Sequence, residues 1–315
     1  EAPVALSNAA KADLYLVIVT LLAAISWIFS REAVLLMPPL LFMALRFLLA
    51  GLLLAAIGYR ELSLLNREAC LRAMKVGIVF GAGMSCWVMG LFLGKHVGEG
   101  AFLTSLGVVL VPIISRIVFG ERQPRSIWYA LPVATAGLAL LSLKNGFHPE
   151  IGQIFYVVAA AIFALYFTLN TRAANAQQHS SADGAITHQK KIPALPLTAI
   201  VLTTVGLLTT LLSLAIEPWQ PTFMHFTAEM AWWILASVVL GSAARFLLQT
   251  HAQSLSTHSH GVVILVIEPV WVALLAAGWF GETMTAIQLT GCALIFVSLL
   301  INRAGLIQQW LRGLF

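Results

Sequence analysis

The sequence predicts an all-α membrane protein in which ten transmembrane helices form two inverted five-helix repeats. Hydrophobic residues make up 60% of the 315 residues and charged residues only 10%, against roughly 45–50% and 25% in an average soluble domain. The apolar residues fall in ten long stretches, each close to the ~20 residues that cross a bilayer. The third observation is a weak similarity between the two halves. This composition excludes intrinsic disorder and argues against a soluble enzyme.

The first half of the chain contains five apolar spans. They lie at about 14–34, 38–58, 72–93, 99–119 and 126–143. Proline, glycine or charge separates them, as in the two prolines of 37–39, because such residues end apolar helices. We predict a first five-helix repeat over 14–143. The preceding stretch, 1–13, contains Lys11 and Asp13 and no hydrophobic run, so we expect a cytoplasmic tail and no cleavable signal peptide.

The second half repeats this arrangement. Its five apolar spans lie at about 152–172, 195–216, 230–250, 261–280 and 284–302. We predict a second five-helix repeat over 152–302 and a C-terminal cytoplasmic tail over 303–315. The polar segment at about 175–193 has no apolar periodicity, which favours a flexible cytoplasmic linker.

The basic residues set the predicted orientation. Eleven Lys and Arg residues fall in loops on the side of the N-terminus, and three (Arg31, Lys95 and Lys144) fall on the other side. Cytoplasmic loops of membrane proteins carry the excess of Lys and Arg, so both termini are predicted to be cytoplasmic. The net charge of +5 is therefore explained by membrane insertion, and we expect no nucleic-acid partner.

The two halves share landmarks at a constant separation. Gly100 opens one span, which ends at the Gly-Glu pair 120–121; Gly261 opens another, which ends at the Gly-Glu pair 281–282. Both landmarks are 161 residues apart, which indicates an internal repeat. Five spans are an odd number, so the second repeat enters the membrane from the opposite side. Inverted repeats are typical of alternating-access transporters, whose substrate site lies near the midplane between the repeats.

Several short runs form a characteristic combination. They are FLTSL at 102–106, VPIIS at 111–115, FGER at 119–122, RFLLAG at 46–51, EPVW at 268–271 and GE at 281–282. Together they resemble the EamA-type, ten-helix branch of the drug/metabolite transporter superfamily. The resemblance covers nearly the whole chain. It implies a multi-pass carrier of the inner membrane that has no enzymatic activity and exports amino acids or other metabolites.

Two charged residues inside the second-half spans are the first candidates for the substrate site. A charge at membrane depth costs at least ~2.5–3.5 kcal/mol on insertion scales, so it usually faces a partner or a watery cavity. Glu268 precedes Pro269, which can open the helix; the carboxylate could bind a proton or a substrate amine, or hold the repeats together. Arg245 could bind a substrate carboxylate through its planar fork, or pair permanently with Glu268.

Two further charged residues receive other roles. Arg46 lies in the middle of the second span, and we expect a structural charge that snorkels or pairs. Glu99 begins the fourth span near the outer surface, where it is either a gate or simply exposed.

Aromatic residues inside the spans are further candidates. Trp27, Trp87, Tyr166 and Trp271 lie well within them, and a buried Trp needs a partner for its N–H group. Lining a cavity would supply one, and a flat wall of rings suits aromatic or cationic substrates. Ordinary packing is the alternative for each.

Known catalytic and cofactor signatures are missing from the sequence. It contains no Walker A, HExxH, GxSxG or dinucleotide-binding motif and no CxxC pair among its three cysteines, so we expect no enzyme, metal or cofactor. We predict a secondary transporter for a small organic metabolite, above all an exporter of aromatic or other neutral amino acids, coupled to protons or facilitative. The alternatives are a carrier of drugs, organic cations or nucleosides, and a membrane accessory protein without transport. The expected state is a monomer or homodimer in the lipid bilayer.

Overall fold

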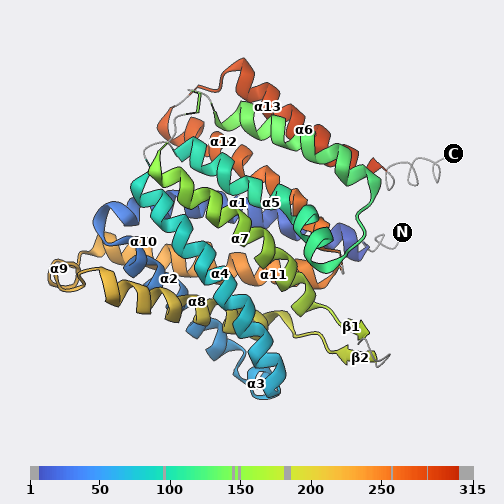
Figure 1. The fold of residues 1–315 in the computed structure, drawn as a ribbon. Helices are drawn as coiled ribbons and strands as arrows, with labels where there is room; N and C mark the ends of the chain where they lie inside the picture. The colour runs from blue at the N-terminus through green and yellow to red at the C-terminus, as the bar shows by residue number, and fades with distance from the viewer. Residues whose placement is uncertain are drawn as a thin grey trace, which may run out of the picture.

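The computed structural model describes residues 7–94, 97–143, 146–147, 150–180, 186–256, 258–281 and 283–304. Helices pack side by side along one general direction, and the described chain begins and finishes at the same end of the bundle (Figure 1). We call this the termini end. Residues 1–6 and 305–315 of the two expected tails lie outside the described part.

The first half consists of long helices joined by short connections. They are α1 (Asn8–Leu36), α2 (Pro39–Ile57), the short α3 (Tyr59–Ser63), α4 (Arg67–Leu93), α5 (Val97–Phe119) and α6 (Arg125–Ser142). Polar side chains fix two of the starts: Ser7 accepts a hydrogen bond from the Ala10 amide, and Asn66 accepts one from the Ala69 amide. The prolines at 38–39 begin α2, where a missing amide proton costs nothing.

The second half contains the helices that change type. Its elements are α7 (Ile151–Ala174), α8 (Ala194–Ile216), α9 (Gln220–Met224), α10 (Ala228–Val238), the π-helix η1 (Val239–Ala244), α11 (Arg245–Ser254), the 3₁₀-helix η2 (Ser259–Ile267), α12 (Glu268–Phe280) and α13 (Ala286–Asn302). The eighth predicted span is thus α10, η1 and α11 in sequence, and the ninth is η2 followed by α12. Helical segments coincide with all ten predicted spans to within a few residues.

The segment expected to be a flexible linker forms a β-hairpin instead. Strands β1 (Gln177–Ser180) and β2 (Ile186–Gln189) are antiparallel, with Gln177 opposite Gln189. Arg72 of α4 donates a 2.7 Å hydrogen bond to the Lys190 carbonyl and so ties the hairpin to the bundle. The pairing joins backbone groups, so the polar side chains of this segment gave no sign of it.

The outer surface of the bundle is suited to lipid. Seven described helices are long and apolar enough to cross a membrane, and 261–275 and 286–302 are shorter apolar helices. Large apolar side chains point outward along them, including Leu52, Ile78 and Leu211. A soluble protein would bury such a continuous apolar surface.

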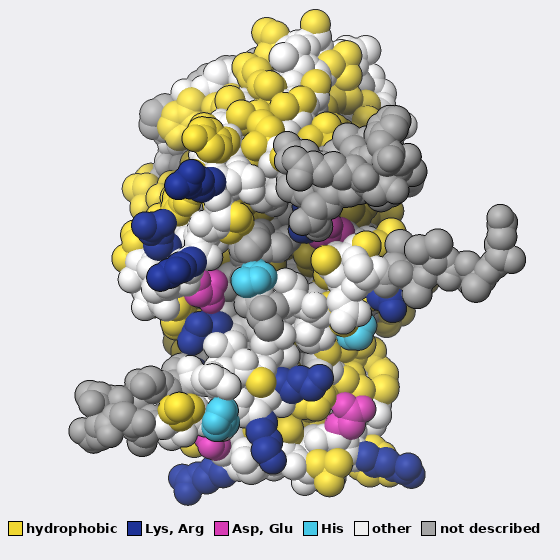
Figure 2. Space-filling view, turned by 90° about the vertical axis from the view of Figure 1, so that its right-hand side faces the viewer, with side chains coloured by type: hydrophobic (Ala, Val, Ile, Leu, Met, Phe, Trp, Pro, Cys, Tyr) yellow, Lys and Arg dark blue, Asp and Glu magenta, His cyan; other side chains and the backbone are white. Residues whose placement is uncertain are grey.

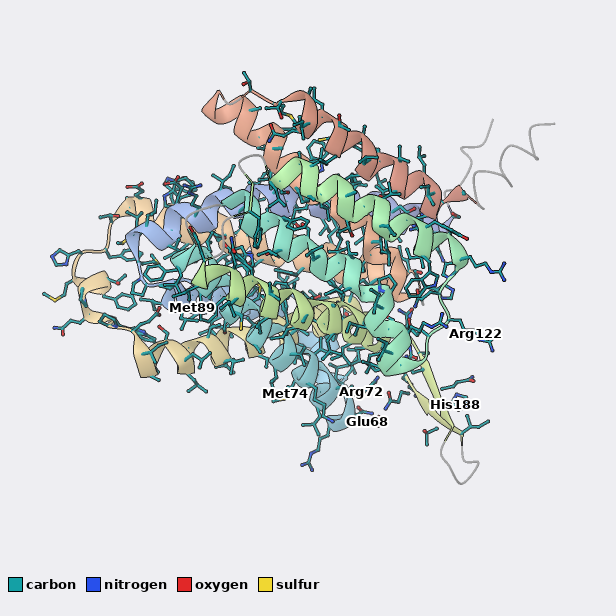
Figure 3. All side chains as sticks on the ribbon, turned by 45° about the horizontal axis from the view of Figure 1, so that its top comes forward. Glu68, Arg72, Met74, Met89, Arg122 and His188 are labelled. Atoms are coloured by element: carbon teal, nitrogen blue, oxygen red, sulfur yellow. The ribbon has the colours of Figure 1, made fainter. Side chains whose placement is uncertain are left out.

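The termini end carries the polar surface. Figure 2 looks onto this end and shows Lys and Arg side chains spread across it. Arg72, Arg122, Glu68 and His188 all lie there (Figure 3). The arrangement matches the one-sided distribution of basic residues in the sequence.

Glycines bring helices from the two halves into backbone contact. Helix α2 packs on α8 and α6 on α13. A Cβ atom added to Gly206 of α8 would lie 2.5 Å from the Leu48 amide nitrogen of α2, and one added to Gly51 would lie 2.5 Å from that of Thr203. These four residues form what we call the α2–α8 seam. Small residues permit such close crossing of membrane helices.

A second pair of glycines, in α4, also packs inside the chain. A Cβ at Gly77 or Gly81 would meet Thr204 or Leu208 of α8. This GxxxG motif is therefore occupied by the chain's own helix.

Candidate functional site

A cavity lies between the two halves of the chain. Helices α1, α2, α4 and α5 form one part of its wall, and α7, α11, η2 and α12 form the rest. The lining residues are Ala23, Ser26, Trp27, Arg46, Phe80, Met84, Trp87, Thr104, Ser105, Val108, Phe163, Tyr166, Phe167, Arg245, Phe246, Leu265 and Glu268. We call this the central cavity. The empty space between these walls, open solvent at the mouth included, is about 660 Å³.

Both charged candidates stand where a helix changes type. Arg245 is the first residue of α11, directly after the π-helical turn η1. Glu268 is the first residue of α12, directly after the 3₁₀-helix η2, and Pro269 follows it. Short π-helical segments are rare and frequently occur at functional sites. The irregular backbone thus turns both charges into the central cavity.

Glu268 is held by an aromatic donor. The Trp27 Nε1–H group donates a 2.7 Å hydrogen bond to Glu268 Oε1. Glu268 as a residue is only partly buried and lines the cavity, although its neighbours Ile267 and Val270 are buried. It is therefore fixed in orientation and still open to an occupant of the cavity.

Arg245 has unused donor capacity. Its guanidinium lies 4.5 Å from the ring centroid of Phe246, and its Nε–H is buried without a hydrogen-bond partner in the structure. Arg245 and Glu268 attract each other electrostatically, but the ion pairs found among the described residues do not join them. The two opposite charges face the same cavity separately.

Arg46, by contrast, donates hydrogen bonds from all three of its nitrogens. It is 1% exposed, and it donates to the hydroxyls of Ser242 at 2.6 Å, Ser26 at 2.9 Å and Ser30 at 3.1 Å. Its Nη2 also donates to the Gly241 carbonyl at 2.8 Å. Snorkelling is therefore the wrong description, because this side chain points inward and joins α1, α2 and η1 through neutral oxygens.

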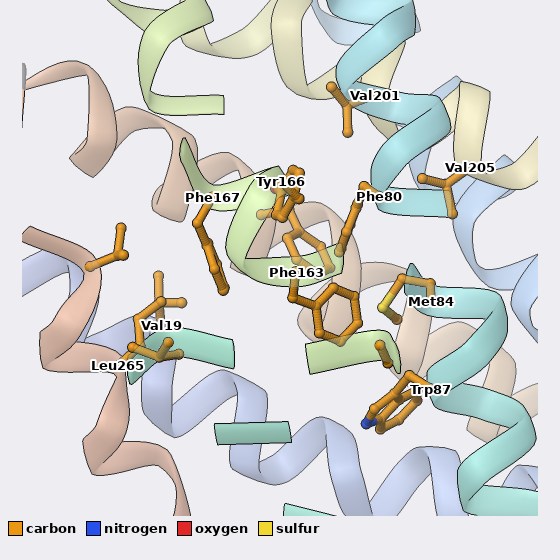
Figure 4. Close-up of a cluster of buried hydrophobic side chains, with 14 of the residues drawn as sticks. Val19, Phe80, Met84, Trp87, Phe163, Tyr166, Phe167, Val201, Val205 and Leu265 are labelled. Atoms are coloured by element: carbon orange, nitrogen blue, oxygen red, sulfur yellow. The ribbon is translucent and has the colours of Figure 1, made fainter. Parts of the chain in front are cut away.

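An aromatic cluster of Phe80, Phe163, Tyr166 and Phe246 lines the central cavity. Figure 4 shows Phe80, Phe163 and Tyr166 close together among other buried apolar side chains. The rings of Phe80 and Tyr166 stack with centroids 3.9 Å apart at 15°. Phe163 lies 5.8 Å and Phe246 5.0 Å from Phe80. Sequence reasoning missed these three phenylalanines, because Phe is common in apolar spans and has no polar atom that requires a partner.

The predicted tryptophans divide into two groups. Trp27 and Trp87 line the cavity and pack edge to face, with centroids 4.9 Å apart at 79°. Trp271 does not line it; its Nε1–H donates a 3.1 Å hydrogen bond to Thr20 of α1. The structure therefore does not bring Trp271 together with the other predicted site residues around the cavity. The side chain of Glu99 lies outside the described part of the chain.

Comparison with known proteins now identifies the family. The model of the EamA-like transporter family matches residues 10–143 and again residues 150–304. The chain belongs to the EamA-like transporter family. An uncharacterized transporter of Archaeoglobus fulgidus is 27% identical over 207 residues, which are 65% of this chain and 67% of that protein. One crystal structure shares the fold with a TM-score of 0.73 at 18% identity, over 95% of this chain and 98% of that one.

This EamA-like transporter also contains a buried polar cluster beside the cavity. Asn170 Nδ2 donates to Gln253 Oε1 at 2.6 Å, and Gln253 Nε2 donates to Thr171 Oγ1 at 2.9 Å. Asn170 also donates to Thr250, and Asn175 donates to the Gln253 carbonyl. We call these five residues the amide cluster.

The amide cluster lies between the central cavity and the termini end. Tyr166 of α7 and Arg245 of α11 line the cavity. Both helices continue from there through the amide cluster toward the termini end. The sequence places the end of the eighth span at about residue 250. The structure shows instead that α11 extends to Ser254 and buries Thr250 and Gln253 against α7.

Proposed function

We propose that this EamA-like transporter is a secondary carrier of the inner membrane that moves a small organic metabolite through the central cavity by alternating access. The observation that carries the proposal is the separate placement of Arg245 and Glu268 in one aromatic-walled cavity. A purely structural ion pair would bring the two groups together. Charges kept apart and accessible are suited to opposite ends of a solute.

Helix pairing supports the two inverted repeats that this mechanism requires. The second and seventh spans meet as α2 and α8, and the fifth and tenth as α6 and α13. The fourth and ninth spans meet as α5 and η2. Each pair joins equivalent positions of the expected repeats, 14–143 and 152–302, as a two-fold axis in the membrane plane would require. In this arrangement all ten spans cross the bilayer and the termini end is cytoplasmic.

Amino acids are the proposed substrates, with aromatic or other neutral ones foremost and export as the direction. The guanidinium of Arg245 is suited to a carboxylate, Glu268 to an amine or a proton, and the rings around Phe80 to an apolar side chain. An organic cation is the second candidate, because Glu268 and the Trp27–Trp87 pair lie together and indole rings attract cations.

A binding screen followed by flux tests the proposal. The purified protein is heated with amino acids, amines, nucleosides and organic cations, since a ligand that binds only the folded state raises the melting temperature. A hit is then tested for saturable counterflow in proteoliposomes. We expect an amino-acid hit that is lost in Arg245→Ala. A flux that rises linearly with solute concentration would indicate a channel and contradict the carrier.

A further inference from the structure

The charges that line the central cavity are unequal. Among the described lining residues, Arg46 and Arg245 are cationic and Glu268 is the one carboxylate. With all three ionised, these side chains give the empty cavity a net charge of +1. A neutral zwitterion leaves that charge unchanged, a cation raises it to +2, and a monoanion brings it to zero.

Among the described residues, no second carboxylate forms an ion pair with either arginine of the cavity. The partners of Arg46 are three hydroxyls and one carbonyl, which solvate the guanidinium without neutralising it. The charges of Arg46 and Arg245 also repel each other. An arginine stays protonated in proteins, and an uncompensated buried charge is costly. The cavity therefore favours an occupant that brings negative charge.

Geometry indicates where that negative charge would lie. Arg46 already uses all three of its nitrogens, which donate four hydrogen bonds to hydroxyls and a carbonyl. Arg245 lines the cavity, has a buried Nε–H without a partner, and lies over the ring of Phe246 in the aromatic cluster. A carboxylate at Arg245 would receive a charge-assisted hydrogen bond, with its apolar body against Phe80 and Tyr166.

We infer that the preferred solute is a net anion, a carboxylate on an apolar or aromatic body, and that the amine of an amino acid is dispensable for binding. The inference rests on the proposed function, since it assigns the solute class of the same cavity. It differs from that proposal because it expects the deaminated acid to bind at least as tightly as the zwitterion.

Three probes with one phenyl body separate the possibilities. They are 3-phenylpropionate (anion), L-phenylalanine (zwitterion) and 2-phenylethylamine (cation), each titrated at pH 7.5 into the purified transporter, with binding measured by thermal shift and calorimetry. We expect 3-phenylpropionate to bind at least as tightly as phenylalanine, and the amine at least about tenfold more weakly than either.

Two variants sharpen the test. In Glu268→Gln the cavity charge rises to +2, so 3-phenylpropionate should bind several-fold more tightly while phenylalanine loses its amine partner. In Arg245→Gln the anion should weaken at least about tenfold, whereas Arg245→Lys keeps the charge and most of the affinity. Affinities are compared only among variants whose melting temperature without ligand equals that of the wild type, so that all of them are folded.

The outcomes distinguish the inference from the proposed function. Binding of phenylalanine without 3-phenylpropionate overturns the inference and leaves the amino-acid carrier standing. Binding of 3-phenylpropionate alone supports the inference and replaces the amino-acid substrate. Tightest binding of the amine overturns both, and binding of none of the three overturns the inference. A weaker 3-phenylpropionate complex in Glu268→Gln also contradicts it.

Discussion

The α2–α8 seam and the central cavity differ in how closely their helices pack and in how regular those helices are. At the seam, regular α-helices from the two halves touch through Gly51 and Gly206, and no room remains for even a methyl group. At the cavity, the second-half helices change to π and 3₁₀ geometry, and the space contains Arg245 and Glu268. Regular helices with small residues thus hold the halves together, while irregular helices create a place for a polar occupant.

The largest expected effect is a loss of stability when the α2–α8 seam is overpacked. In Gly206→Ala the new methyl group would meet the Leu48 backbone at 2.5 Å, and backbone cannot move aside as a flexible side chain does. Overpacking of this kind typically costs about 1–3 kcal/mol, and we expect a cost at the upper end. The matched control is Gly278→Ala in α12, where nothing lies within 4 Å of the added Cβ.

Thermal unfolding of both glycine variants gives the answer. Gly278→Ala should be neutral, or more stable by up to ~1 kcal/mol because alanine favours helix. Equal melting temperatures for the two variants would show that the seam is looser than the structure indicates.

The second-largest effect concerns the cavity, where variants should lose transport and keep their thermal stability, unlike variants of the seam. Arg245→Ala and Glu268→Gln should each reduce amino-acid transport by about 10- to 150-fold, since a hydrogen bond to a charged group contributes ~1.5–3 kcal/mol. Both variants should keep a melting temperature near that of the wild type, because neither residue joins helices through a direct ion pair in the structure. Counterflow of labelled phenylalanine measures the first quantity and thermal unfolding the second. Normal flux in both variants would refute the site.

A smaller effect concerns the orientation of the carboxylate. Trp27→Phe keeps a ring against Trp87 and removes the Nε1–H that donates to Glu268. We expect a several-fold rise in the half-saturating concentration of amino acid, because Glu268 loses a fixed partner worth roughly 1 kcal/mol. An unchanged value would mean that the carboxylate needs no positioning.

The smallest effect should come from Trp271→Phe. Its indole donates to Thr20 outside the cavity, so substrate affinity should stay within about twofold of the wild type. A loss as large as that of Trp27→Phe would return Trp271 to the binding site and show that the cavity changes shape during transport.

The sequence predicted those features that depend on local composition. Apolar length placed the helices, and the cost of intramembrane charge singled out Arg245 and Glu268. The requirement of indole N–H groups for a partner led to Trp27, which meets Glu268. The same requirement failed for Trp271, because a threonine hydroxyl on a neighbouring helix satisfied it as well as a cavity would.

The remaining features depend on contacts between distant segments. The four partners of Arg46 come from α1 and η1, and nothing near residue 46 in the sequence indicates them. The amide cluster depends on α7 and α11 meeting across about 80 residues of chain. The hairpin depends on backbone pairing, which leaves little mark on side-chain composition.

The amide cluster carries a consequence for energy coupling. It joins α7 to α11 through carboxamides, hydroxyls and backbone carbonyls, and none of these groups titrates near neutral pH. His251 stands outside it, exposed and against the ring of Tyr15. If α7 separates from α11, hydrogen bonds between neutral groups are replaced by hydrogen bonds to water. The free energy of that separation should not depend on pH or on salt concentration. Glu268 is the one carboxylate among the described residues that line the cavity, so a proton that acted there would act at a different place from the amide cluster.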